Sequence, residues 1–122
     1  MSMEISVVIP TRNSERFIAQ TLQAVQKGTY HPAEILVVDG CSTDQTTSIA
    51  RTFGAKIVEN RMLHAANARN IGIVESKSPI IAFTDSDCIP AVNWLESIAF
   101  NFLNDTQLAG VGGPVLLSHP IN

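Results

Sequence analysis

The chain has 122 residues, the length of a single domain, and 45% of its residues are hydrophobic while 16% are charged. This balance is enough to build a core, which excludes an intrinsically disordered chain. The net charge is −3 and the eight lysines and arginines are scattered, so no nucleic-acid partner is expected.

The first predicted strand covers residues 5–10, a β-branched run that a proline stops. Ser14 is a suitable N-cap for the first helix, which extends to about Lys27. Residues 34–39, EILVVD, predict a second buried strand. The turn GCSTD that follows it opens a second helix, which ends at Gly54.

Residues 56–60 predict a third, shorter strand. Residues 64–75 fit a helix, although Gly72 lowers the helix propensity of this segment. Residues 80–85, IIAFTD, predict a fourth strand that is apolar almost to its end. The segment therefore repeats the strand-then-helix order of the first half.

Pro90 begins a further helix, and residues 108–117 predict a fifth strand interrupted by glycines. The apolar residues that this helix turns inward are Trp94, Leu95, Ile98 and Leu103. The alternation of strands and helices predicts an α/β fold, a three-layer sandwich with a mainly parallel sheet. Ligands of such open sheets bind outside the carboxyl ends of the strands, where functional residues are expected.

The two cysteines, Cys41 and Cys88, stand far apart in no metal-binding spacing, so free thiols in a reducing compartment are expected. Cys88 follows the two acidic residues, and two roles stay open for it: a metal ligand, or a small buried residue that fills space in the core. The sequence shows no charged leader and no long apolar run. A cytoplasmic location is expected, with membrane association only through residues outside this sequence.

Polar residues stand at the carboxyl ends of three predicted strands: PTRN at 10–13, Asp39, and the pair Asp85 and Asp87. Carboxylates crowded together need a cation between them, and hard oxygen ligands suit Mg²⁺ or Mn²⁺. In extended backbone, residues two apart point to the same side, so the pair can share one ion while Ser86 faces away. Since Mg²⁺ completes its shell with water and phosphate oxygens, the pair predicts a metal that carries a diphosphate.

Each of these residues alone also fits a purely structural role. The acidic pair fits a solvated turn, Asp39 a helix cap, Asn13 a turn residue, and Arg69 a surface ion-pair partner. Their order and spacing along the chain favour a site over these separate roles.

Four motifs in this order resemble the nucleotide-binding half of family-2 glycosyltransferases. They are VVIPTRNSERFIAQTLQAV, EILVVDGCSTDQT, AANARNIGI and IIAFTDSD, within a span from about Ile5 to Val115. The resemblance implies the GT-A fold of nucleotide-diphospho-sugar transferases. It also implies transfer of a sugar from a nucleotide diphosphate, by family habit UDP, to an acceptor hydroxyl in cell-wall, polysaccharide or glycolipid synthesis.

The resemblance also implies a role for each matching position. The substrate-binding residues would be Pro10, Thr11, Arg12, Asn13, Glu15, Asp39, Arg69, Asn70, Asp85 and Ser86. The first five would form the first nucleotide-contacting loop. Asp39 would accept a hydrogen bond from the base, and Arg69 would face the diphosphate while Asn70 supports its loop. Asp85, near the ribose, and Asp87, the direct ligand, would hold Mn²⁺ or Mg²⁺.

Two positions depart from the common family pattern. Arg12 stands where many relatives have an aromatic residue that stacks on the base, and its guanidinium plane can stack there instead. Gly40 stands where many relatives have a second acidic residue, and glycine makes the turn easier to form. The identity of the base is therefore less firmly indicated than the diphosphate.

Inverting members of the family also need a carboxylate as general base, which in relatives lies well downstream of the acidic pair. Glu96 and Asp105 are the only acidic residues after Asp87, and both fall in or at the end of the predicted helix. We therefore interpret residues 1–122 as the donor-binding part of a truncated domain without its acceptor-binding half. Alone it is expected to bind a nucleotide-diphospho-sugar without transferring it, and an exposed sheet edge would favour a homodimer. The acceptor is unknown.

The sequence also bears on four other function classes. A donor-binding or scaffold module without catalysis stays open. A nucleotidyltransferase would carry a glycine-rich basic loop after the first strand, which PTRNSERF does not provide. A haloacid dehalogenase-like phosphatase needs a lysine downstream of its acidic pair, whereas the last lysine here is Lys77. A dinucleotide-binding dehydrogenase would need G-x-G-x-x-G after the first strand, and no such motif follows that strand here.

Overall fold

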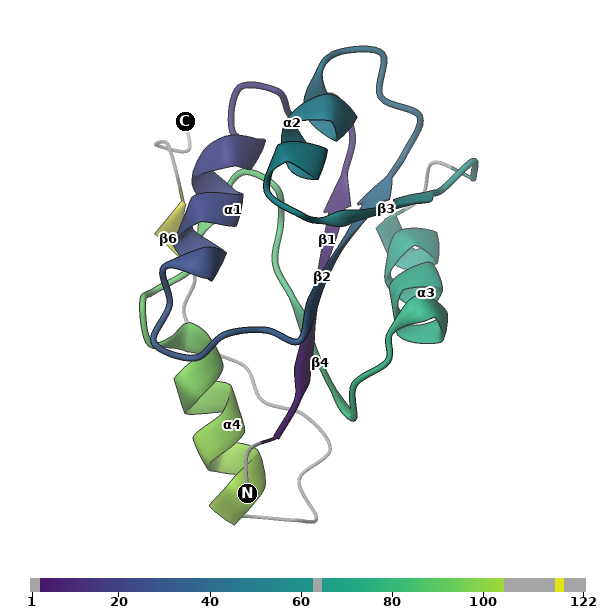
Figure 1. The fold of residues 1–122 in the computed structure, drawn as a ribbon. Coiled ribbons are helices and arrows are strands. Elements are labelled where there is room, and N and C mark those ends of the chain that lie inside the picture. Colours follow the sequence, from purple (N-terminus) through teal and green to yellow (C-terminus); the bar gives the residue numbers. More distant parts are fainter. Residues whose placement is uncertain (1–2, 63–64, 105–115, 118–122) are drawn as a thin grey trace.

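A computed structural model describes residues 3–62, 65–104 and 116–117 of the chain (Figure 1). Ten elements follow one another along these residues. They are β1 (Ile5–Thr11), α1 (Ile18–Gln26), β2 (Glu34–Asp39), α2 (Thr46–Thr52), β3 (Lys56–Glu59), α3 (Ala65–Glu75), β4 (Ile80–Phe83), β5 (Cys88–Ile89), α4 (Trp94–Asn104) and β6 (Leu116–Leu117).

A four-stranded sheet in the order β3-β2-β1-β4 forms the centre of the molecule, and every pairing in it is parallel. In Figure 1 helices α1, α2 and α4 cover one face of this sheet, while α3 covers the other. The short strands β5 and β6 pair separately and antiparallel. The arrangement confirms the predicted α/β sandwich with a mainly parallel sheet.

Two hydrophobic clusters fill the space between the layers. The larger one packs alternate residues of β1, such as Val7 and Ile9, against α1, α2 and α4. The smaller one packs Val8, from the opposite face of the same strand, against Ala68 of α3. Because both faces of β1 are buried, its sequence is a continuous apolar run instead of an alternating one.

Two helices begin later than the sequence predicts. Helix α1 begins at Ile18, and the predicted N-cap at Ser14 is wrong: its hydroxyl lies 2.7 Å from the Ser86 hydroxyl, and helix α1 has no side-chain cap. Helix α4 begins at Trp94 and not at Pro90, which instead follows the two residues of β5. A local signal for a helix start was outweighed in the first case by a contact with a distant residue.

Toward the C-terminus the structure tests three further expectations from the sequence. Strand β4 ends at Phe83, before the acidic pair. Leu103, expected to point inward, is half exposed, whereas Leu95 is buried as predicted. Of the predicted strand 108–117, only Leu116–Leu117 is described, as β6, and the rest lies outside the described residues.

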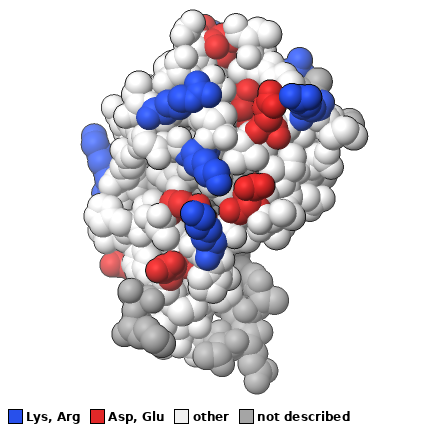
Figure 2. Space-filling model, turned by 45° about the vertical axis from the view of Figure 1, so that its right-hand side comes forward, with Lys and Arg blue, Asp and Glu red and all other residues white. Residues whose placement is uncertain are grey.

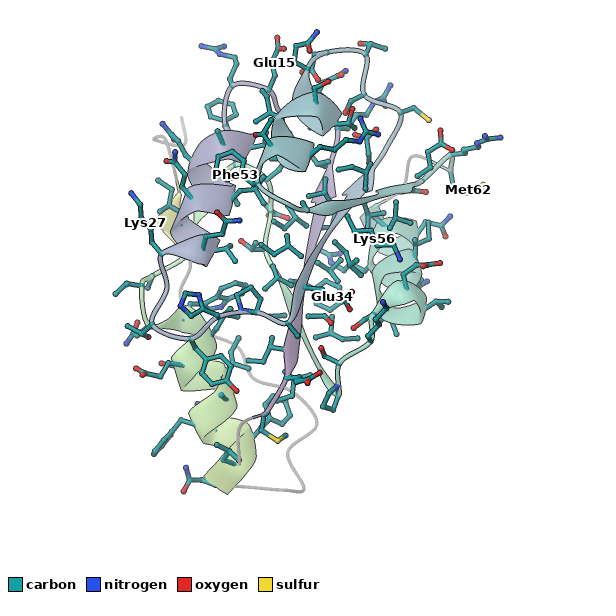
Figure 3. All side chains as sticks on the ribbon, in the orientation of Figure 1. Glu15, Lys27, Glu34, Phe53, Lys56 and Met62 are labelled. Carbon is teal, nitrogen blue, oxygen red and sulfur yellow. The ribbon has the colours of Figure 1, made fainter. Side chains whose placement is uncertain are left out.

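Glu34, labelled in Figure 3, ties β1, β2 and the segment before β4 together. Its carboxylate accepts hydrogen bonds from the Ser6 hydroxyl at 2.6 Å and the Lys77 amide at 2.7 Å. Partial burial raises the pKa of Glu34, but these hydrogen bonds and the charges of Lys77 and Lys56 outweigh it and hold the pKa below its ordinary value. The ionised carboxylate therefore stabilises the fold.

We expect Glu34→Gln to lower the free energy of unfolding by about 1–2 kcal/mol at neutral pH, because a charge-assisted hydrogen bond is weakened. Since the folded-state pKa is lowered, the contribution is present above the ordinary value of 4.5 and is lost as the pH falls through the folded value. Thermal unfolding should therefore show the variant and the natural chain converging in acid. Glu4→Gln, at an exposed position, is the control; a constant gap at all pH values would contradict the prediction.

Candidate functional site

A cleft of about 470 Å³ lies where β1 and β4 end. Its walls come from the β1–α1 loop, the ends of β2 and β3, the first half of α3 and the residues after β4. They are Pro10, Thr11, Arg12, Asn13, Ser14, Phe17, Val38, Gly40, Asn60, Ala68, Asp85, Ser86 and Asp87. The cleft is thus at the carboxyl edge of the parallel sheet, where the sequence predicts a site.

The acidic pair is carried by a tight turn and not by the end of a strand. The Cys88 amide donates to the Asp85 carbonyl at 3.3 Å, which closes the turn. Asp85, Asp87 and Cys88 each place one potential ligand atom so that all three lie within 4.8 Å of one another. The expectation that the two carboxylates can share one ion holds geometrically, but the turn produces it, not the alternation of an extended strand.

Ser86, between the two acidic residues, was expected to face away from them. Its side chain is buried, and its hydroxyl pairs with that of Ser14 on the β1–α1 loop at 2.7 Å. Ser86 therefore lines the cleft and also links the acidic turn to the first loop.

Cys88 is buried beside the acidic pair, and its thiol donates to Asp87 Oδ1 at 3.7 Å. Burial raises the pKa of Cys88, and the negative charges of Asp87 and Asp85 raise it further. A thiol is also a soft ligand, whereas Mg²⁺ and Mn²⁺ prefer hard oxygen ligands. The two carboxylates are the groups suited to a hard cation.

The β1–α1 loop and the β2–α2 loop are held together by side chains. Asn13, at a positive φ of 48°, accepts a hydrogen bond from the Thr43 amide at 2.8 Å. Glu15, labelled in Figure 3, accepts one from the Gln45 amide at 3.0 Å. Their oxygens thus position the two loops, Glu15 does not line the cleft, and nucleotide contacts by Asn13 and Glu15 stay predictions.

Asp39 is only 5% exposed at the end of β2. Its carboxylate accepts two hydrogen bonds from Ser42, from the amide at 3.0 Å and from the hydroxyl at 2.5 Å. Asp39 borders a neighbouring hollow with Cys41 and Arg51 instead of the cleft itself. Asp39 thus stabilises the turn after β2 and does not cap α2, whose N-cap is Gln45, so the helix-cap alternative is wrong. Contact of Asp39 with a base stays a prediction.

The two predicted residues of α3 are not brought into the cleft. Asn70 borders a separate small hollow, together with Asn67 and Ile71. Arg69 is exposed and is not among the residues that line the cleft, whereas its neighbour Ala68 is. Contacts of Arg69 with a diphosphate, and support from Asn70, stay predictions.

Six residues that line the cleft were not predicted as site residues: Ser14, Phe17, Val38, Gly40, Asn60 and Ala68. Asn60 follows β3 and is 3% exposed, and its backbone N–H donates to the Asp39 backbone carbonyl at 2.7 Å. The rule that identified the ends of the other strands would have identified it too. Phe17 had no such signal, because its apolar side chain reads as part of the helix core.

Charges on the face that includes α3 and β3 are mixed. Figure 2 shows lysine and arginine side chains interspersed with acidic ones on the face it draws. Two exposed ion pairs belong to this mixture, Lys56 with Glu75 at 3.7 Å and Arg61 with Glu59 at 3.3 Å. A uniformly basic stripe of the kind that binds nucleic-acid backbones does not cover this face. Among the described residues, no helix is long and apolar enough to span a bilayer.

Comparison with known sequences places the chain among sugar-transferring proteins. The sequence profile described as "Glycosyl transferase family 2" matches residues 6–116. Glycosyltransferase AglE of Haloferax volcanii is 37% identical over 95% of this chain, which corresponds to 40% of AglE. Glycosyltransferase GlyG of Streptococcus pneumoniae is 36% identical over 80% of this chain and 35% of GlyG. The chain thus spans less than half the length of these relatives.

Comparison with solved structures gives the same result. Residues 1–349 of Staphylococcus aureus TarS, in complex with UDP, superpose with a TM-score of 0.76 at 26% identity, covering 92% of this chain and 38% of TarS. Glucosyl-3-phosphoglycerate synthase of Mycobacterium tuberculosis, with Mn²⁺, UDP and glucosyl-3-phosphoglycerate, superposes with a TM-score of 0.68 at 26% identity. That match covers 77% of this chain and 37% of the synthase.

Proposed function

Because the chain belongs to glycosyltransferase family 2 and has the GT-A fold, we propose that it binds the UDP part of a nucleotide sugar in the cleft after β1 and β4. The observation that carries this proposal is the turn on which Asp85 and Asp87 bring their carboxylates together at the wall of the cleft. Two solved relatives, TarS and the mycobacterial synthase, are described as complexes with UDP.

The residues present fit a divalent cation. Two hard carboxylates on one turn match the way Mg²⁺ and Mn²⁺ are held by one or two acidic side chains, with water and phosphate oxygens as the other ligands. Asp85 is exposed and Asp87 is half buried, so water and a diphosphate can approach. The bound cation would neutralise charge on the departing diphosphate. The mycobacterial synthase, described with Mn²⁺, supports this assignment.

The remainder of the cleft suits the other parts of a nucleotide. Thr11 Oγ1 is buried and has no hydrogen-bond partner among the described residues, which leaves it for a ligand. Arg12 is exposed at the rim of the cleft, where its guanidinium can pair with phosphate or stack on the base. Gly40 borders the cleft and has no side chain, so a nucleotide base can approach its backbone closely.

We assign sugar transfer to the longer protein of which this chain is the donor-binding part. Neither Glu96, which is exposed on α4, nor any other described carboxylate outside the acidic turn lines the cleft, so a general base would come from elsewhere. Four features stay predictions: inversion of configuration, a role in cell-wall, polysaccharide or glycolipid synthesis, the cytoplasmic location and a homodimer. Donor binding without catalysis is the second candidate for these 122 residues, and the length relative to AglE favours it.

Calorimetric titration of the chain with UDP, in Mn²⁺ and in chelator, tests the proposal. We expect binding that is at least about tenfold tighter with Mn²⁺, because the cation links the acidic turn to the diphosphate. Pyrophosphate should compete, since it shares the metal-binding part of the ligand, whereas uridine should not. A chain that is folded but binds no UDP at millimolar concentration in Mn²⁺ would contradict the proposal.

A further inference from the structure

The hydroxyl of Thr21, on α1, contacts the acidic turn from inside the protein. Thr21 is fully buried, and its Oγ1 lies 2.8 Å from the carbonyl oxygen of Ser86 and 2.7 Å from that of Cys88, so its single proton is shared between them in a three-centre hydrogen bond. These two carbonyls flank Asp87 in the sequence. One buried hydroxyl thus holds the backbone on both sides of a proposed metal ligand.

This contact is not the one a threonine ordinarily makes within a helix. The Thr21 hydroxyl lies 3.5 Å from the carbonyl of Phe17, one turn earlier, which is long for a hydrogen bond between oxygens. Its short contacts go to the turn instead. The hydroxyl is therefore committed to the turn and not to its own helix.

Helix α1 is a rigid support for this contact. Ile18 and Leu22, which neighbour Thr21 on the buried face, are fully buried in the larger core cluster. The Ser14 hydroxyl adds a second link, to the Ser86 side chain at 2.7 Å. Because both flanking carbonyls are held against α1, the backbone at Asp87 is fixed, and the Asp87 side chain lies at the wall of the cleft.

We propose that Thr21 is a positioning residue for the divalent cation: its hydroxyl presets the Asp85–Cys88 turn so that the two carboxylates meet the ion without rearrangement. The proposal deepens the proposed function and rests on it. Two like charges on one turn repel each other when no cation is bound, so a free turn would move them apart. A turn held from behind keeps them in place, as groups behind a metal ligand commonly do.

Two substitutions separate the hydroxyl from the shape of the side chain. Thr21→Val keeps the branched shape and removes the donor, while Thr21→Ser keeps the donor and removes a methyl group. We expect Mn²⁺ affinity, measured by electron paramagnetic resonance with UDP present, to fall about tenfold in Thr21→Val and to stay within about twofold in Thr21→Ser. Amide exchange at Cys88 should speed up in Thr21→Val, because its hydrogen bond closes the turn.

Val25→Ala is the matched control, since Val25 is a core residue of the same helix that does not line the cleft. It should lower the unfolding temperature and leave Mn²⁺ affinity unchanged well below that temperature. If Thr21→Val does not fold, Thr21→Cys replaces it, because a thiol is a weak donor, and it must bind Mn²⁺ more weakly than Thr21→Ser.

Each outcome tests either the positioning role of Thr21 or the donor site itself. If the natural chain binds Mn²⁺ and the folded Thr21→Val variant binds it equally well, the positioning role is overturned and the donor site stands. If Thr21→Val and Thr21→Ser lose affinity to the same extent, the hydroxyl is not responsible and the role is likewise overturned. If the natural chain binds no Mn²⁺ with UDP present, the proposed donor site itself fails, and the positioning role with it.

Discussion

Asp87→Asn is expected to remove most of the Mn²⁺-dependent affinity for UDP. Asparagine keeps the size of the side chain but offers a neutral oxygen, so Asp85 alone would supply negative charge to the cation. Loss of one charged partner in a close charge pair commonly weakens binding by about 2–5 kcal/mol. Since each 1.4 kcal/mol is about a factor of ten, affinity should fall by about 30-fold or more. Calorimetric titration with UDP in Mn²⁺ measures the change directly.

Glu75→Gln is the control for this variant, because it makes the same change of charge on α3, where Glu75 pairs with Lys56 at the surface. Its UDP affinity should equal that of the natural chain. In chelator, Asp87→Asn and the natural chain should bind UDP equally weakly, since the cation no longer contributes. An Asp87→Asn variant that keeps its full response to Mn²⁺ would show that the cation is held by other residues.

The fold could be predicted because its main signals are local in the sequence. Continuous apolar runs, such as the one within 34–39, indicate strands that are buried on both faces. The alternation of such strands with helices along the chain indicates a parallel sheet with helical connections. Gly54, at a φ of +79°, ends the second helical region where a glycine stop was predicted. The start of α1 was missed because Ser14 makes its contact with Ser86, far along the chain.

The site could be predicted in place but not in detail. Strand ends gave the edge of the sheet, so the 10–13 loop and the acidic pair lie in one cleft as expected. Asp39 was expected to accept a hydrogen bond from the base, yet its carboxylate accepts hydrogen bonds from Ser42 in its own turn. Asn13 and Glu15 were also expected to contact the nucleotide, yet their oxygens accept hydrogen bonds from the neighbouring β2–α2 loop. Those contacts depend on how two loops pack, and neither loop sequence alone reports it.

Gly72→Ala is expected to destabilise the chain, although alanine is the better helix former. A Cβ atom at this position would lie 2.4 Å and 2.9 Å from the two γ-carbons of Val8. Val8 is fully buried in the smaller core cluster, so it has little room to yield. The gain in helix propensity is about 1 kcal/mol, whereas overpacking of this severity costs about 3 kcal/mol. Thermal and urea unfolding should show a net loss of about 2 kcal/mol.

Ile73→Ala, at a half-exposed position of the same helix, is the control and should change stability by no more than about 0.5 kcal/mol. Combining Gly72→Ala with Val8→Ala removes the clash, so the double variant should be more stable than the sum of the single effects predicts. A rise in unfolding temperature for Gly72→Ala would mean that α3 moves away from β1 at little cost. Because Ala68 of α3 forms part of the cleft wall, such a movement would also change UDP affinity, which gives the clash a second readout at the site itself.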